Sequence, residues 1–191
     1  MEKKWIITGL LLILIIIFGI SYIISKKTDF SPEANVVLEE CNTLKNNGNN
    51  NVDIVFFSPK ENAEKYMDFF LQTSPFDENK DKFNFYYIDA YKPTCELYKG
   101  IAILCYSKEL IKKASSCPND IIVVIDTQSS EIRSSSYMNV LSINTNHELS
   151  VLSHEFGHAF ANLAEEYVPA KIPRGIKNCV SKCENFEGEK N

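Results

Sequence analysis

The chain opens with an unbroken apolar run at residues 5–24, which contains no charged residue and has lysines on both sides. At about 1.5 Å per residue, a helix of this length reaches about 30 Å, which is the hydrocarbon thickness of a bilayer. A cleaved signal peptide is the alternative, but its apolar region is normally shorter and ends in a small-residue cleavage site. The run therefore predicts an N-terminal transmembrane anchor over residues 1–27, followed by a polar stalk over residues 28–51.

Beyond the stalk, short apolar runs alternate with segments of helical periodicity. Four runs rich in β-branched and aromatic residues predict strands, at residues 52–57, 83–89, 120–126 and 137–143. Three amphipathic or capped segments predict helices, at residues 58–72, 107–115 and 147–163. The last strand alternates in polarity, as an edge strand would, and residues 90–106 are irregular, as a surface excursion would be. This order predicts an α/β fold around a mixed, mostly parallel β-sheet.

All six cysteines lie after the apolar run, and none of them forms a C-x-x-C pair. Disulfides persist outside the cytosol, so an even number of cysteines favours an extracytoplasmic domain over one with buried free thiols. The predicted pairs, taken from proximity in the sequence and from the remainder, are Cys95–Cys105, Cys179–Cys183 and Cys41–Cys117.

The charge balance bears on the class of partner. Acidic residues outnumber basic ones by 25 to 20, which gives a formal net charge of −5 without a basic stripe. Nucleic-acid-binding domains normally carry clustered Lys and Arg. The composition therefore speaks against a nucleic-acid partner.

The most specific chemical signal is the pentad H-E-F-G-H at residues 154–158. On a helix, His154 and His158 project from one face a single turn apart, so both can reach one ion. Glu155 is then placed to act as a general base on metal-activated water. An amphipathic helix with two solvated histidines is the alternative, although two of the three histidines in the chain fall in this spacing. The pattern predicts one catalytic Zn²⁺ with His154 and His158 as ligands and Glu155 as the base.

Catalytic zinc usually has three protein ligands, and the candidates for the third are Glu165 and Glu166. On an unbroken helix, Glu165 would lie about 16 Å along the axis from His154, too far to share the ion. The chain must therefore turn back, and Asn162 is the expected pivot because Asn tolerates the left-handed conformation. We favour Glu165 as the third ligand and keep Glu166 as the alternative.

Two further residues near the pentad have weaker signals. His147 lies about 10 Å from His154 along a helix, so we expect a surface histidine there rather than a ligand, with a substrate contact as the alternative. Tyr167 is a candidate to stabilise the transition state, because phenols near catalytic zinc can hydrogen-bond a developing oxyanion. The alternative for Tyr167 is ordinary packing.

The segment HEFGHAFANLAEEY, residues 154–167, resembles the active-site segment of the IgA-peptidase-type zinc metallopeptidases, a zincin family with metzincin-like character. The similarity extends upstream and covers about residues 52–183. It implies an α+β zincin-like catalytic domain over residues 52–191, with the acidic pair before Tyr167 supplying the third ligand. The family usually has Gly at position 162 and Asp at position 165. Only 24 residues follow Tyr167, fewer than in the family, and no methionine follows Met138 to form the methionine turn of metzincin-like proteins. Either the domain is truncated at its C-terminal end or the lower half of its cleft is minimal.

Together these signals predict a membrane-anchored, zinc-dependent metalloendopeptidase that acts on protein or peptide substrates. The predicted location is the cell membrane, single-pass, with the catalytic domain on the extracytoplasmic side. A substrate strand is expected to pair with the edge strand at residues 137–143. The alternatives are a non-catalytic, membrane-tethered zinc-binding scaffold with a relic site, and a zinc hydrolase that does not act on peptides.

Overall fold

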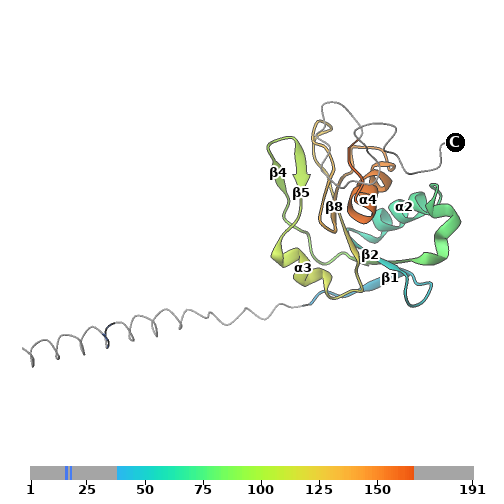
Figure 1. The fold of residues 1–191 in the computed structure, drawn as a ribbon, viewed down its shortest axis with the longest axis horizontal. Coiled ribbons are helices and arrows are strands. Elements are labelled where there is room, and N and C mark those ends of the chain that lie inside the picture. The colour runs from blue at the N-terminus through green and yellow to red at the C-terminus, as the bar shows by residue number, and fades with distance from the viewer. Residues whose placement is uncertain (1–15, 17, 19–37, 166–191) are drawn as a thin grey trace, which may run out of the picture. The chain divides into compact units, whose positions relative to one another are not determined.

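The computed structural model describes residues 16, 18 and 38–165 (Figure 1). The chain divides into two compact units, Met1–Val37 and Leu38–Asn191. Among the residues that the structure describes, no helix is both long and apolar enough to cross a membrane. The predicted anchor lies outside the described residues, except for Ile16 and Phe18. The prediction of a transmembrane helix, and of the single-pass cell-membrane location that depended on it, is corrected to this finding: the described residues contain no such helix.

A six-stranded mixed sheet forms the centre of the second unit, in the order β1-β3-β2-β6-β8-β7. The four inner strands run parallel, and β1 and β7 pair antiparallel at the two edges. The strands of this sheet are β1 (Asn42–Lys45), β2 (Val52–Phe57), β3 (Phe83–Ile88), β6 (Ile121–Asp126), β7 (Ser135–Tyr137) and β8 (Val140–Asn144). The predicted α/β class with a mixed, mostly parallel sheet agrees with this arrangement.

Helices cover both faces of the sheet (Figure 1). The helical elements are α2 (Lys60–Phe70), the 3-10 segment η1 (Phe76–Lys82), α3 (Lys108–Ala114) and α4 (Val151–Ala161). Successive side chains of a strand point to opposite faces, so Phe56 of β2 packs with α2 and α4 while Val55 packs with α3. A two-stranded hairpin, β4 (Glu96–Tyr98) and β5 (Ala102–Leu104), lies on the α3 side, where Ile103 joins the same core.

The prediction of a zincin-like fold is corrected. The sequence suggested a zincin-like domain, but α4 is only eleven residues long and nothing in the described architecture identifies it as a zincin-like active-site helix. The α4 helix also begins at Val151, later than the predicted start at His147. The structure supports the coarser α/β class alone.

Both edges of the sheet differ from the prediction. Residues 42–45, assigned to the stalk, form β1, and their pairing with β3 places the start of the domain before residue 52. The single edge strand predicted at residues 137–143 is a hairpin instead, because Met138 turns the chain with a φ of 53°. As a result β7 is the edge strand and β8 is buried throughout.

Two of the three predicted disulfides are present among the described residues. Cys41–Cys117 joins the start of β1 to the segment after α3, and Cys95–Cys105 closes the base of the β4–β5 hairpin. These two pairings are confirmed. Cys179 and Cys183 lie outside the described residues.

A cluster of aromatic rings holds α4 against α2 and the sheet. Phe70 of α2 is 1% exposed, and its ring contacts those of Phe76, Phe83, Phe85 and Phe156 at centroid distances of 4.0 to 6.1 Å. Of these, Phe156 lies within the predicted metal-binding pentad. The packing that positions α4, the helix that carries the pentad, is therefore continuous with the main core.

Replacing Phe70 with Ala is expected to lower the free energy of unfolding by about 3–5 kcal/mol, because the substitution leaves a cavity where several rings meet. Phe160, which is 55% exposed and meets the cluster only by stacking on Phe156, is the control, and its replacement with Ala should cost about 1 kcal/mol or less. Urea unfolding followed by circular dichroism measures both values. Equal losses for the two variants would contradict the role given to Phe70.

Candidate metal centre

The chain reverses direction directly after α4. Asn162 adopts the left-handed conformation, with φ 54° and ψ 45°, and its backbone N–H donates to the carbonyl oxygen of Gly157. The N–H of Leu163 donates to the same carbonyl oxygen at 3.3 Å. A Cβ atom on Gly157 would lie only 3.3 Å from the Leu163 side chain, so glycine gives the returning segment room to close. The predicted pivot at Asn162 is confirmed.

This reversal brings Glu165 to the two histidines of the pentad. The Nε2 atoms of His154 and His158 lie 3.1 Å apart, and Oε2 of Glu165 lies 3.5 Å from each of them. These three residues are the one group of metal-ligating side chains found among the described residues. This group differs from the H-E-x-x-H pentad. It contains the two histidines of the pentad but not Glu155, and its third member, Glu165, lies beyond the end of α4.

The spacing of the three atoms fits a small tetrahedral ion. Ligand atoms about 2.0–2.1 Å from a tetrahedral zinc lie roughly 3.3 Å from one another, close to the observed separations. Oε2 of Glu165 is also shielded from solvent and has no hydrogen-bond partner among the described residues. A buried carboxylate oxygen without a partner is costly, and a cation would satisfy it. The donor set and its geometry therefore fit a divalent metal such as zinc.

A backbone contact sets the tautomer of His158. Its Nδ1 atom lies 2.6 Å from the carbonyl oxygen of Leu163. A carbonyl oxygen can only accept a hydrogen bond, so Nδ1 carries the proton and Nε2 keeps a free lone pair directed at His154 and Glu165. Metal-binding histidines in proteins are commonly oriented in this way. The turn at Asn162 thus positions two of the three ligands.

Glu155 lies beside this group but is buried, with 6% of the residue exposed. Burial raises the pKa of its carboxyl group to about 7, and the nearby Glu165 carboxylate adds to the rise. His158 and a hydrogen bond with the Ser136 side chain act in the opposite direction without cancelling the effect of burial. A carboxyl group that titrates near neutral pH can both accept and donate a proton under physiological conditions.

In metal-free protein, replacing Glu155 with Gln is expected to raise the free energy of unfolding at pH 7 and above, by up to about 3 kcal/mol. The folded state holds this proton more tightly than the unfolded chain, whose carboxyl pKa is near 4.5. The free energy of unfolding of the wild type therefore falls as pH rises from about 4.5 to about 7. The Glu155→Gln variant has no carboxyl group at this position, so its free energy of unfolding should not show this fall. Urea unfolding with chelator at several pH values measures the difference. A difference that is constant over this range would contradict the raised pKa.

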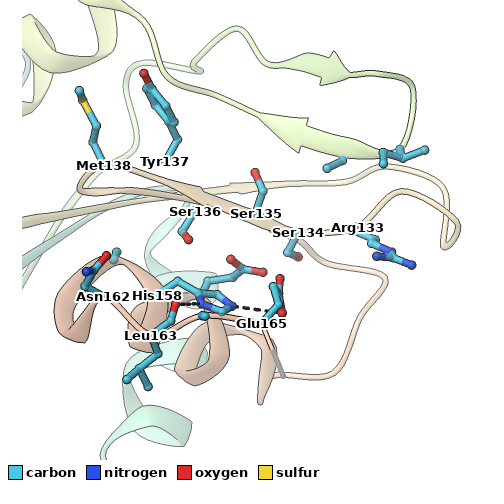
Figure 2. A pocket seen from close by; sticks show the side chains of 15 residues that line it. Arg133, Ser134, Ser135, Ser136, Tyr137, Met138, His158, Asn162, Leu163 and Glu165 are labelled. Carbon is cyan, nitrogen blue, oxygen red and sulfur yellow. Dashed lines mark hydrogen bonds and ion pairs between the residues drawn. The ribbon is translucent and has the colours of Figure 1, made fainter. Parts of the chain in front are cut away.

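Two cavities meet at this group of residues. The larger has a volume of about 660 Å³ and the smaller about 320 Å³, and both are lined by Glu155, Glu165, Arg133 and Ser134. Figure 2 shows Ser134 and Ser136 pointing toward His158 and Glu165, whereas Ser135 between them points the other way, toward the carbonyl oxygen of Ile103. A cleft between the edge strand β7 and α4 therefore passes over the candidate metal ligands.

The remaining predicted site residues have different outcomes. His147 is half-buried, lines the smaller cavity and lies outside the metal-binding group, with its Nε2 atom 3.1 Å from the carbonyl oxygen of Ser130. Glu166 and Tyr167 lie outside the described residues. Sequence reasoning missed Ser136, which contacts Glu155, and Ile101, which lines the larger cavity. Neither residue has a local sequence signal, because each reaches the site only through tertiary structure.

No family model matches this chain, and no curated protein matches it. The resemblance of residues 154–167 to the IgA-peptidase-type metallopeptidases therefore stays a prediction.

Proposed function

We propose that this protein is a zinc-dependent metallopeptidase that hydrolyses peptide bonds in protein or peptide substrates. The observation that carries the proposal is the convergence of His154, His158 and Glu165 at 3.1 to 3.5 Å beside the buried carboxyl group of Glu155. A structural metal site needs no proton acceptor next to it, whereas hydrolysis does. The similarity of residues 154–167 to the IgA-peptidase-type active-site segment supports the same reading.

His154, His158 and Glu165 would hold the zinc ion. Two imidazoles and one carboxylate leave a fourth position open, which is the usual arrangement in catalytic rather than structural zinc sites. Bound there, zinc supplies Lewis-acid polarisation of the substrate carbonyl group and makes water more acidic. The hydrogen bond from His158 to the Leu163 carbonyl oxygen holds one ligand in the required orientation.

Glu155 performs the proton transfers in this proposal. Its carboxylate accepts a proton from the attacking water and passes it to the nitrogen of the leaving amine. A pKa of about 7 suits both steps, because the group is neither too weak a base nor too weak an acid at neutral pH. The hydrogen bond with Ser136 of β7 orients the carboxyl group toward the cleft.

The edge strand offers a place for the substrate main chain. β7 (Ser135–Tyr137) is an antiparallel edge of the sheet, and all three of its residues line the larger cavity with Glu155 and His158. An extended peptide can bind an exposed edge by main-chain hydrogen bonds. In this proposal the substrate lies beside β7 and across the group formed by Glu155 and the candidate ligands.

The test is to measure metal content and peptide cleavage on the same purified full-length protein. We expect about one zinc per chain, cleavage of a mixed peptide library, loss of cleavage with a chelator, and recovery on adding zinc. A protein that holds zinc but cleaves no peptide would instead be a scaffold, or a hydrolase of small amides or esters if it acts on those. Either result, or the absence of zinc binding, would refute the proposed function.

A further inference from the structure

Large apolar side chains exposed on the domain are concentrated around the cleft. Within residues 38–165, the exposed large apolar residues other than Leu38 lie on the β4–β5 hairpin and just after it, at the β7–β8 turn, and at the end of α4: Leu97, Tyr98, Ile101, Tyr106, Tyr137, Met138, Phe160 and Leu163. Scattered apolar residues on a surface need no explanation, but a concentration next to a cavity marks an interaction site. Ile101, Tyr137, Met138 and Leu163 line the larger cavity directly.

The β4–β5 hairpin that forms part of this surface is fixed in place. The disulfide Cys95–Cys105 closes its base. On one side, Ile103 N–H donates to the Arg133 carbonyl oxygen and Arg133 N–H donates to the Ile101 carbonyl oxygen, each at 2.9 Å. The Ser135 hydroxyl group of β7 also donates to the Ile103 carbonyl oxygen. Because the hairpin is already ordered, a ligand that binds to it loses little free energy in ordering it.

The cavity next to the hairpin has two kinds of lining. Ser134, Ser135, Ser136 and Glu155 make one part polar, whereas the part near the β7–β8 turn is apolar. Figure 2 shows Tyr137 and Met138 at one end of the row of side chains and Arg133 at the other. A polypeptide in extended form presents both a polar main chain and side chains, so it can use both parts of this lining.

We propose that the β4–β5 hairpin, together with Tyr137 and Met138, is a docking wall that selects polypeptide segments carrying a large apolar side chain. The ligand is a peptide segment because the wall continues into the cavity that contains edge strand β7 and Glu155. The inference rests on the proposed function only for the cleavage of the bound segment. Binding to the wall itself requires no metal and no cleavage.

The test measures binding by the full-length Glu155→Gln protein, which should leave peptides intact. Fluorescently labelled peptides of one scaffold carry either Leu or Ser at a single position, and the position is moved along the peptide. At the position that meets the wall, we expect the Leu peptide to bind about tenfold more tightly by anisotropy, since burying part of one apolar side chain typically gives a factor of this order.

Three further substitutions, each added to the Glu155→Gln protein, test whether the preference for Leu over Ser arises at the wall. Ile101→Asn should reduce the Leu-over-Ser ratio to about one, and Met138→Asn should reduce it as well, because Asn accepts the positive φ at that position. Leu38→Asn is the matched control, since Leu38 is as exposed as Ile101 but does not line the cavity, and it should leave the ratio unchanged.

Equal binding of Leu and Ser peptides at every position would overturn the docking wall, and so would the same loss in the Leu38→Asn control. A third result would also overturn the proposal: the protein binds no peptide but self-associates, and Ile101→Asn abolishes the self-association. A second copy of the chain would then cover the wall. The docking wall and the proposed peptidase function can be refuted independently of each other. Selective binding without cleavage by zinc-loaded wild type would refute the peptidase alone, and cleavage without selectivity would refute the wall alone.

Discussion

Replacing Glu155 with Gln is expected to lower kcat for peptide hydrolysis by about 10²–10⁴-fold, the usual contribution of a general base, while the zinc content stays near that of the wild type. The carboxyl group of Glu155 is buried beside the candidate ligands and is not one of them, so the amide should fill the same space without disturbing the metal. Steady-state kinetics on a cleaved peptide and metal analysis of the same sample measure the two quantities.

Glu148 provides a matched control for this substitution. It is exposed just before α4, and its carboxylate contacts only the Ser150 hydroxyl group at 3.5 Å among the contacts described. Glu148→Gln should therefore leave kcat within about twofold of the wild type. If Glu155→Gln retained the wild-type kcat, Glu155 would not be the base and the proposed mechanism would be wrong.

Replacing His158 or Glu165 with Ala is expected to weaken zinc binding by at least about 100-fold, because each removes one of three ligands and changes outside the ligand shell already cost 10–100-fold. The side chain of His158 is 16% exposed and that of Glu165 is 37% exposed, so neither change should unfold the domain. Competition with a chromophoric zinc chelator measures the affinity, and circular dichroism checks the fold.

Two matched variants make this result specific to the proposed ligands. His147→Ala removes a histidine from the same cleft but outside the metal-binding group, so zinc affinity should stay within a few-fold of the wild type. Glu166→Ala removes the neighbouring acid that the sequence left as an alternative ligand. Loss of zinc in Glu166→Ala but not in Glu165→Ala would show that the third ligand had been assigned to the wrong residue.

If Glu155 is the proposed general base, its buried carboxyl group links activity to stability. A glutamate held at a pKa of about 7 is partly ionised in an environment that disfavours the charge, and this destabilises the metal-free fold at neutral pH. The same environment gives the group a pKa suited to proton transfer. Gln at this position is therefore expected to produce a more stable but inactive protein, a trade-off that is common at active sites.

Local sequence signals were sufficient for much of the fold. The largely apolar runs of β2, β3 and β6 identified three of the inner strands, because parallel strands buried on both faces carry apolar side chains at most positions. Proximity in the sequence gave the Cys95–Cys105 pair. The histidine spacing and the tolerance of Asn162 for a left-handed turn were also local properties, and both pointed to the candidate ligands His154, His158 and Glu165.

Other features depended on contacts between distant segments, and the sequence pattern misled there. The pattern at residues 137–143 could not show that a turn at Met138 would add β7 and bury β8, because the burial of a strand depends on its neighbours in the sheet. The predicted transmembrane helix rested on local hydropathy and flanking lysines, and the part of the chain that the structure describes contains no helix of that kind. Residues 90–106 gave no signal that their hairpin would pair with Arg133 and border the cleft, since those partners lie about thirty residues away in the chain.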